Sequence, residues 1–367
     1  MMNIVECLKS QEDSKIVELL DTNMPLNIVK KTVEAWSIHT DIDLDMVADF
    51  YEKLRARDLD ITHLHKSEKD THPVNVMVKE NEIFKRSLET LNKTLYDNED
   101  ALDAFSALFN HFNRKEKLFL PLFERKGIHT FGRIMWKKDD EVRNFYKALR
   151  KRIARLGDIE ERHILKSIED FKNAFLEVIR IEELLFLPLA YLSLSEKEMA
   201  QVQLESSAYP AVVPYEAEET RDKIPLDDKT MIPIGAGFLS VKELDLILNN
   251  LPLEITFIDE NGIFKYFNDM VETREMMFVR TPLSIGRMVS HCHPPNSVSR
   301  VMQLIRDLKS KKKSEEVMWF KKNEKFVYVT YKALFDEEDK YMGILEYVQD
   351  IAPIFELERS MKKYIEN

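Results

Sequence analysis

A histidine, a lysine and a glutamate lie close together in one short stretch, HFNRKEKLFLPLF at residues 111–123. A histidine and a carboxylate four residues apart on a helix lie on one face and can bind the same metal ion. Here the fourth residue after His111 is Lys115, and Glu116 comes one place later. At about 100° per residue, position 115 lies near His111, and position 116 points to a neighbouring helix or to solvent. The stretch therefore predicts a helix with inward polar residues and leaves metal binding open.

A second group of chemically versatile side chains lies in HCHPPNS, where His291 and His293 flank Cys292. Imidazole and thiolate are good metal and haem ligands, so these three residues are candidates for ligand binding or redox chemistry. Their spacing differs from that of haem-attachment and zinc motifs. The alternative is structural, because the two prolines preset a turn and the Asn-Ser pair after them caps the next helix. We expect a structural role for His293, and Cys292 is the stronger candidate for a pocket-lining thiol.

The composition limits the function classes. The chain has 367 residues, 44% hydrophobic and 32% charged, with only 8 glycines, which is typical of a helix-rich globular protein. A net charge of −11 argues against nucleic acid as the main partner. Cys7 and Cys292 are too few for a disulfide framework. The start lacks the pattern of an export signal, and the longest apolar stretch, at 184–194, is too short to cross a bilayer. We therefore expect a cytoplasmic protein without a nucleic-acid or membrane partner.

Changes in residue pattern divide the chain into five parts. Residues 1–70 carry short amphipathic helices broken by turns, which predicts a small helical domain. Residues 71–205 carry longer helical stretches, and residues 206–230 form a proline-containing linker. Residues 231–352 change to alternating, strand-like patterns. Residues 353–367 predict an amphipathic helix that pairs with a partner or with a second copy.

Four stretches between residues 72 and 205 repeat apolar residues at steps of three and four. Such a repeat on helices joined by modest loops is typical of a four-helix bundle. Four polar residues interrupt the apolar stripes, and the geometry of the repeat makes the stripes face one another. These residues are Asn81, His111, Lys115 and Glu182. We therefore predict a buried polar layer inside the bundle.

The C-terminal third alternates between strand-like and helical patterns. The stretch LEITFIDENGIFKYFN gives a strand, a turn at Asn261–Gly262 and a second strand. EEVMWF, KFVYVTYKALF and YMGILEYVQDI predict three more strands, and SVSRVMQLIRDL predicts a helix before them. This order predicts a small α+β domain with one antiparallel sheet. Its interior, which we expect to include Phe257, Phe264, Phe267, Met276 and Met277, is either a packed core or a pocket for a small ligand.

Residues 72–188 resemble the haemerythrin-like HHE cation-binding domain, with a histidine opening the first helix and HFNRKE in the second. Residues 231–352 resemble a PAS-type sensor domain through FIDENGIFKYFN, RTPLSIGRMVSHCHPPNSV and GILEYVQDI. Residues 1–70 occupy the place of a helical N-terminal domain of the same prokaryotic family. The resemblance implies a multidomain protein. Its all-α N-terminal part includes a four-helix haemerythrin-like bundle, and its C-terminal part is an α+β PAS-like domain with one antiparallel sheet.

The resemblance also implies a metal centre of histidines and carboxylates inside the bundle. The positions that match are His72, His111, Asp139 and Glu182, with Glu116 as a less favoured ligand. Two positions depart from the family pattern, because Asp139 stands where a histidine is usual and Val178 replaces another histidine. Imidazole and carboxylate ligands suit iron, manganese or zinc.

The alternative is a metal-free network in which Lys115 pairs with Glu182 or Asp139 and His111 hydrogen-bonds beside them. An ammonium group in the ligand layer repels a divalent cation, and buried carboxylates need a positive partner. Lysine becomes a ligand only when its pKa is strongly depressed. Both interpretations remain open from the sequence.

The sequence contains no Ser–His–Asp arrangement, P-loop or dinucleotide-binding glycine pattern, so we do not expect an enzyme. Our leading hypothesis is a sensory or regulatory protein that detects a small ligand, a metal, or a redox or oxygen signal. It would transmit that signal through contact with a protein partner or by self-association. One alternative is a non-haem iron protein that handles oxygen, nitric oxide or iron, and another is a non-enzymatic adaptor. The cofactors considered are iron or another divalent metal in the bundle and a small ligand in the PAS-like domain.

Overall fold

The computed structural model describes residues 4–59, 71–91, 102–155, 157–213, 226–322, 325–355 and 357. The chain forms two compact units, residues 1–219 and residues 220–367, which are considered separately. Among the described residues, no helix is both long enough and apolar enough to span a bilayer.

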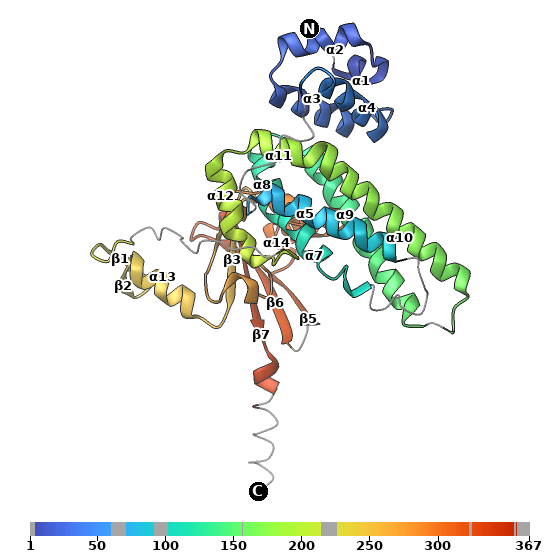
Figure 1. The fold of residues 1–367 in the computed structure, drawn as a ribbon. Helices are drawn as coiled ribbons and strands as arrows, with labels where there is room; N and C mark the ends of the chain where they lie inside the picture. The colour runs from blue at the N-terminus through green and yellow to red at the C-terminus, as the bar shows by residue number, and fades with distance from the viewer. Residues whose placement is uncertain are drawn as a thin grey trace. The chain divides into compact units, whose positions relative to one another are not determined.

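The first unit begins with four short helices (Figure 1). Asp43 caps the last of them by accepting a hydrogen bond from the backbone N–H of Met46 at 2.9 Å. The third helix packs on the helices that follow, and Trp36 meets Phe131 edge to face with ring centroids 6.0 Å apart. The helices are α1 (Ile4–Ser10), α2 (Asp13–Thr22), α3 (Pro25–Ile38) and α4 (Leu44–Arg55). The structure is helical here, and a separate domain at residues 1–70 stays a prediction, of which residues 1–3 and 60–70 lie outside the described part.

The rest of the first unit is a bundle of longer helices (Figure 1). Two of its helical stretches contain an internal π-helical turn, at Lys115–Phe119 and at Glu182–Phe186. The α-helices are α5 (Pro73–Thr90), α7 (Leu108–Arg114), α8 (Leu120–Arg125), α9 (Thr130–Ile153), α10 (Glu161–Ile181), α11 (Leu187–Ser193) and α12 (Glu196–Glu205). Gly127 follows α8 with a φ of +81°, a conformation that suits glycine after the end of a helix.

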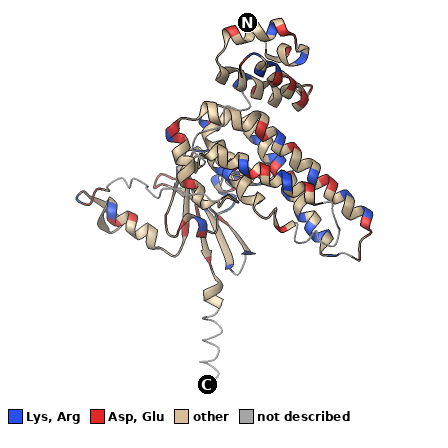
Figure 2. Cartoon of the chain, viewed as in Figure 1, with Lys and Arg blue, Asp and Glu red and all other residues tan. Residues whose placement is uncertain are grey.

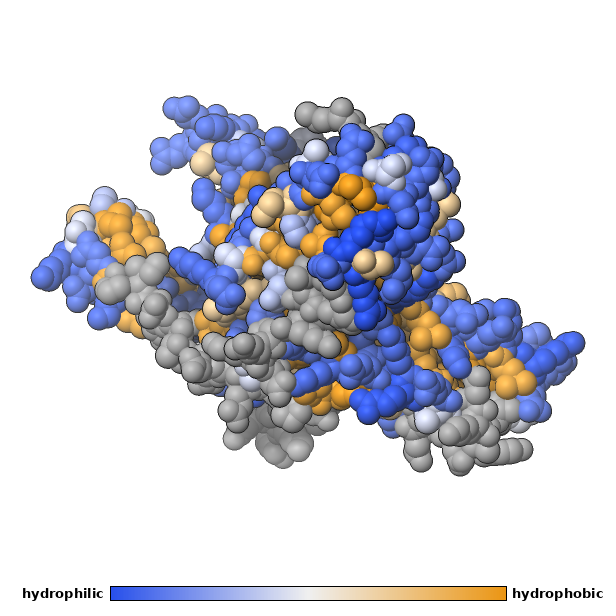
Figure 3. Space-filling model, turned by 45° about the horizontal axis from the view of Figure 1, so that its top comes forward, coloured by the Kyte–Doolittle hydropathy of each residue, from blue (hydrophilic) through white to orange (hydrophobic). Residues whose placement is uncertain are grey.

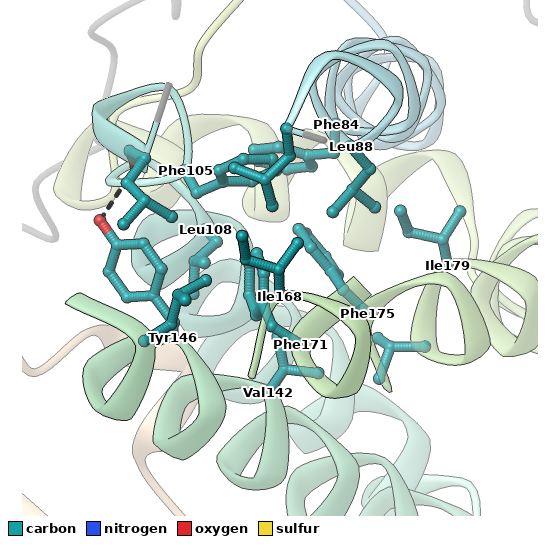
Figure 4. Close-up of a cluster of buried hydrophobic side chains, with 14 of the residues drawn as sticks. Phe84, Leu88, Phe105, Leu108, Val142, Tyr146, Ile168, Phe171, Phe175 and Ile179 are labelled. Atoms are coloured by element: carbon teal, nitrogen blue, oxygen red, sulfur yellow. Dashed lines mark hydrogen bonds between the residues drawn. The ribbon is translucent and has the colours of Figure 1, made fainter. Parts of the chain in front are cut away.

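Aromatic side chains form much of the bundle core. Phe175 lies at its centre, with its ring centroid 5.2 Å from that of Phe84, 5.7 Å from Phe112 and 5.8 Å from Phe171. Figure 4 shows Phe84 of α5 pointing toward Phe171 and Phe175 of α10. All of these rings are fully buried. This core holds the helices rigidly around the polar layer described below.

The two π-helical turns share a local sequence. The pentapeptide LFLPL occurs at residues 118–122 and again at residues 185–189, so a proline follows each turn by two residues. Proline lacks an N–H and its ring clashes with the carbonyl four residues earlier, so a regular α-helix cannot continue through it unchanged. A wider turn before the proline accommodates this defect. The fixed angle of 100° per residue therefore applies within α7, which contains His111, and not through the π-helical turn that begins at Lys115.

The predicted linker at residues 206–230 begins too early. Residues Ser206–Ala208 form a 3₁₀ turn directly after α12, and the side chains of Ser206, Ala208 and Tyr209 are buried. This part of the chain, up to Val213, belongs to the first unit by its contacts. Residues 214–225 lie outside the described part of the chain.

The second unit is built on a five-stranded antiparallel sheet in the order β4-β3-β7-β6-β5 (Figure 1). The strands are β3 (Glu254–Asp259), β4 (Phe264–Phe267), β5 (Glu315–Lys322), β6 (Lys325–Phe335) and β7 (Tyr341–Asp350). Helix α14 (Pro295–Lys309) packs on the face that carries Ile258, Ala333 and Ile344. Gly343 has a φ of +142°, and a Cβ there would lie 2.2 Å from the carbonyl oxygen of Ile258. That glycine therefore allows β7 to pair closely with β3.

The prediction of one sheet was incomplete. A separate two-stranded sheet, β1 (Met231–Ile234) and β2 (Gly237–Ser240), precedes α13 (Val241–Asn250). The residues of β1 are all exposed, so the in-and-out alternation that reveals a strand is missing there. Figure 3 shows hydrophobic surface on this part of the chain, at the left of the view. The exposed apolar residues include Met231, Phe238, Leu246 and Ile247.

The predicted C-terminal helix is described only at its start, where Ala352–Phe355 are helical. Residues 358–367 lie outside the described part, so the pairing of this helix with a partner stays a prediction. The assignment of Phe257 to the interior was wrong. Because Ile258 faces the core and neighbouring strand residues point to opposite faces, Phe257 lies on the other face of the sheet.

Candidate functional site

Five fully buried side chains from four parts of the bundle meet in one continuous line. Lys115 and Glu182 are the first residues of the two π-helical turns, so the widened turns begin where these side chains enter the interior. His111 comes from α7, Asp139 from α9 and Glu80 from α5. Each of the five is 0% exposed. The structure thus brings together residues that are up to about a hundred positions apart in the sequence.

Lys115 lies between two carboxylates. Its Nζ donates a hydrogen bond to Oδ1 of Asp139 at 2.7 Å and another to Oε1 of Glu182. The ammonium group also lies 4.8 Å from the ring centroid of Phe112, which adds a cation–π contact. The lysine therefore neutralises the acids that surround it.

His111 joins Glu182 to Glu80. Its Nε2 lies 3.1 Å from Oε2 of Glu182, and its Nδ1 lies 2.8 Å from Oε2 of Glu80. An ionised carboxylate only accepts hydrogen bonds, so both ring nitrogens must carry a hydrogen. The geometry therefore requires a cationic imidazolium. Burial lowers the pKa of His111, but the carboxylates of Glu182 and Glu80 outweigh this effect and raise it above its ordinary value.

Arg114 completes the line at the Glu80 end. Its Nη2 donates to Oε2 of Glu80, and its Nη1 donates to the carbonyl oxygen of Tyr209 at 3.3 Å. We call these six residues the buried charged chain. In order they are Asp139, Lys115, Glu182, His111, Glu80 and Arg114. Their charges alternate in sign, with three acids and three bases.

The charge balance of this chain explains how it tolerates burial. Burial alone raises the pKa of Glu182, but Lys115 and His111 lower it to about 2. The pKa of Glu80 is likewise lowered to about 2, because His111 and Arg114 outweigh the effect of burial. Asp139 differs, because burial raises its pKa well above the ordinary value and Lys115 only partly opposes this. Both glutamates are therefore ionised at neutral pH, and Asp139 is the first of these carboxyls to take up a proton.

Glu116 lies beside the chain rather than in it. It is buried, and its Oε1 accepts a hydrogen bond from Nη1 of Arg143 on α9 at 2.6 Å. The side chain of Glu116 was expected to point either to a neighbouring helix or to solvent, and it points to the neighbouring helix α9. Arg143 also donates to Asp140 at 3.1 Å, so one guanidinium pairs with two carboxylates. Charged residues of both signs are interspersed along α9 and α10 (Figure 2), and among them Asp139, Arg143 and Glu182 beside the end of α10 are buried.

Two other predicted residues lie outside the chain. His72 caps the start of α5, with its Nδ1 accepting the N–H of Val74 at 3.2 Å, and its ring packs against Tyr191 with centroids 6.0 Å apart. Asn81 is fully buried on α5, but neither atom of its amide has a hydrogen-bond partner. The second oxygen of Asp139 is also buried without a partner.

The cysteine and its two flanking histidines lie at the turn before α14. The thiol of Cys292 donates to the carbonyl of Met288 at 3.6 Å, and Nδ1 of His293 lies 2.9 Å from the carbonyl oxygen of Val289. Val289–His291 form a 3₁₀ turn, and the carbonyl of His291 accepts a hydrogen bond from Arg287 at 2.7 Å. These contacts fit a turn held by local hydrogen bonds. A ligand or redox role for these three residues stays a prediction.

The inner face of the PAS-like sheet carries a second buried charged group. Arg280 donates to Oε2 of Glu254 at 2.9 Å and to Oε1 of Glu346 at 2.5 Å. Glu254 also accepts the backbone N–H of Phe278 at 3.2 Å. Because Glu254 is on β3 and Glu346 on β7, the arginine fastens the segment around residue 280 to two strands of the sheet.

Two known protein families match part of each unit. Residues 72–190 match the haemerythrin HHE cation-binding domain, and residues 244–352 match the PAS domain. The chain joins a haemerythrin HHE domain to a PAS domain. The comparison with curated proteins finds no match.

Solved structures are similar to part of the chain. A C-terminal domain from Streptococcus mutans is 48% identical, covers 36% of this chain and 99% of its own, and has a TM-score of 0.35. A PAS domain from Colwellia psychrerythraea is 14% identical, covers 31% of this chain and 98% of its own, with a TM-score of 0.24. A sensory box sensor histidine kinase from Vibrio cholerae is 11% identical, covers 30% of this chain and 90% of its own, with a TM-score of 0.23.

The haemerythrin match implies a metal centre, and the residues of this bundle do not fit one. Both nitrogens of His111 donate to carboxylates, so no lone pair is available for a metal. The ammonium of Lys115 contacts both Asp139 and Glu182. The three bases of the buried charged chain already balance its three acids, so no negative charge is left over for a metal ion. In the described ranges, no three His, Cys, Asp or Glu side chains are grouped so that they could hold a metal ion.

Sequence reasoning missed Glu80, Arg114 and Arg143. Glu80 lies three residues after Met77 and four before Phe84, so the helical spacing already placed it on the inward face. Arg114 and Arg143 lie at the edges of the apolar stripes, where a long side chain usually reaches solvent. The repeated LFLPL stretch was the available signal for the two π-helical turns.

Proposed function

We propose that the protein is a non-enzymatic sensory regulator whose bundle uses a lysine-centred ion network in place of a metal centre. The observation that supports this is the position of Lys115, fully buried and bonded to Asp139 and Glu182. A buried carboxylate needs a positive partner, and the lysine supplies the charge that a metal ion would otherwise supply. The PAS domain is the second sensing element in this proposal.

The proposed output is contact with a protein partner or with a second copy of the chain, in the cytoplasm. PAS and haemerythrin domains joined in one chain support a regulatory role, with the two domains detecting a small ligand or a redox or oxygen signal. Detection of these signals would not depend on a metal ion bound among the six residues of the buried charged chain.

A metal-loading experiment tests the proposal. Full-length protein is purified without oxygen, incubated with Fe(II), Mn(II) or Zn(II), desalted and analysed for metal content and optical absorption. We expect clearly substoichiometric metal, because a divalent cation must displace the charge of Lys115 and remove a proton from His111. The variant Lys115→Glu places a carboxylate four residues after His111 and leaves the acids in excess, so we expect it to gain metal.

The matched control is Lys117→Glu, which makes the same charge change in the same π-helical turn but outside the buried charged chain. It should bind no more metal than the natural protein. Stoichiometric iron in the natural protein, with the absorption of an iron–oxygen centre, would contradict the proposal. That result would favour the other candidate, a non-haem iron protein for oxygen, nitric oxide or iron, which the haemerythrin match supports.

A further inference from the structure

The buried charged chain ends on the segment through which the polypeptide leaves the bundle. We define the exit segment as residues 206–213, which follow α12. The second compact unit, which contains the PAS domain, begins at residue 220. The exit segment is therefore the last described part of the first unit before the chain passes to the second.

Glu80 uses its two oxygens for different tasks. Its Oε2 accepts from His111 and Arg114, and its Oε1 accepts the backbone N–H of Val212 at 2.9 Å. Arg114 makes a parallel link, because it donates to Glu80 and to the carbonyl of Tyr209. Two residues of the chain thus hold two backbone groups of the exit segment.

Beyond Tyr209, the side chains of the exit segment are not buried, so its backbone hydrogen bonds to Glu80 and Arg114 contribute to its position. Tyr209 is 3% exposed, whereas Val212 is 39% exposed. The N–H of Val212 therefore bonds to an ionised, fully buried carboxylate although its own side chain lies at the surface. Hydrogen bonds to charged groups are stronger than those between neutral groups, so the strength of this bond depends on the charge of Glu80.

We infer that Glu80 is a positioning residue that links the bundle interior to the exit segment. The hydrogen bonds of the buried charged chain determine, through Glu80, how strongly the backbone of the exit segment is bound. Glu182 orients His111, His111 orients Glu80, and Glu80 holds Val212. A change at Asp139, Lys115 or Glu182 alters the hydrogen bond from His111 to Glu182. It thereby alters the strength of the hydrogen bond from His111 to Glu80. The change reaches the exit segment without any contact between that segment and Glu182. This inference rests on the proposed regulatory function, to which it adds the route from the bundle toward the PAS domain.

Hydrogen exchange in the full-length protein tests this route. The readout is the exchange rate of the Val212 amide, measured by mass spectrometry on peptides within residues 206–213. Glu80→Gln weakens the bond directly, and Glu182→Gln changes only the far end of the route. We expect each variant to speed exchange of the Val212 amide by about tenfold, the equivalent of about 1.4 kcal/mol. Glu183→Gln, one residue along and on the partly exposed side of the same turn, should leave the rate unchanged.

Amides around Phe175 in the bundle core provide the internal reference, because general destabilisation would speed their exchange as well. The inference is overturned if Glu182→Gln leaves Val212 exchange at the natural rate while Glu80→Gln speeds it. It is also overturned if the core amides accelerate by the same factor as Val212. Hydrogen exchange measures hydrogen bonding and not metal content. An unchanged Val212 exchange rate in Glu182→Gln would therefore overturn this inference alone, whereas stoichiometric metal binding would overturn the proposed function.

Discussion

Replacement of Lys115 by methionine is expected to destabilise the first unit by about 3–5 kcal/mol, the usual cost of removing one partner from a buried ion pair. Methionine fills a similar volume but carries no charge, so Asp139 loses its hydrogen-bonded base and Glu182 keeps only His111. Part of the loss is relieved by protonation of Asp139, whose pKa is already raised by burial. Unfolding in denaturant, followed by the helical circular dichroism signal, measures the effect.

The control for this variant is Lys137→Met on α9, an exposed lysine two residues before Asp139. Surface changes of this kind usually alter stability by less than about 0.5 kcal/mol. In the Lys115→Met background, adding Asp139→Asn and Glu182→Gln should recover part of the stability because it removes the unpaired charges. If Lys115→Met costs no more than Lys137→Met, the lysine does not neutralise these acids.

Replacement of Arg280 by methionine is the second change with a large expected effect. It leaves Glu254 and Glu346 buried on the inner face of the sheet without their shared cation. Since both carboxylates are largely buried, we expect a loss of about 3–5 kcal/mol in the stability of the second unit. Hydrogen exchange of peptides from β6 and β7, at increasing denaturant, measures that loss separately from the first unit.

Arg274→Met is the matched control in the same unit. Arg274 pairs with Glu272 at 2.6 Å, but both side chains are more than 60% exposed, so water already solvates them. Its exchange profile should follow that of the natural protein. Equal exchange in the Arg280 and Arg274 variants would show that Arg280 does not fasten its segment to the sheet.

The sequence predicts the helices of the bundle well, because the apolar repeat is long and regular. The same repeat identifies His111, Lys115 and Glu182 as inward-facing, and the structure brings these three residues together. It does not bring His72 to them, because that histidine serves as a helix cap. A histidine at the start of a helix fits the sequence pattern of a metal ligand and that of a helix cap. Only the positions of the other candidate ligands in the structure distinguish these two roles.

Other features depend on geometry that a regular helix does not have. The two π-helical turns, at Lys115–Phe119 and Glu182–Phe186, do not follow from a regular apolar repeat, and the repeated LFLPL stretch is the sequence signal for them. Arg114 and Glu80 bind the backbone of Tyr209 and Val212 in the early part of the expected linker, and such backbone contacts leave no pattern in the side chains. In the second unit, strand-like residue patterns predict the strands of the five-stranded sheet, whereas β1 is exposed throughout and shows no alternation of buried and exposed residues.

The ammonium of Lys115 lies between Asp139 and Glu182, and we propose that it takes the place of the metal that a haemerythrin-type bundle would hold. Crystals of the full-length protein grown with Mn(II) or Fe(II) test this directly through anomalous diffraction. We expect no anomalous peak within the buried charged chain, and density for Lys115 in contact with both carboxylates. A strong anomalous peak bound by Glu182 and His111, with Lys115 displaced from Asp139, would contradict the account.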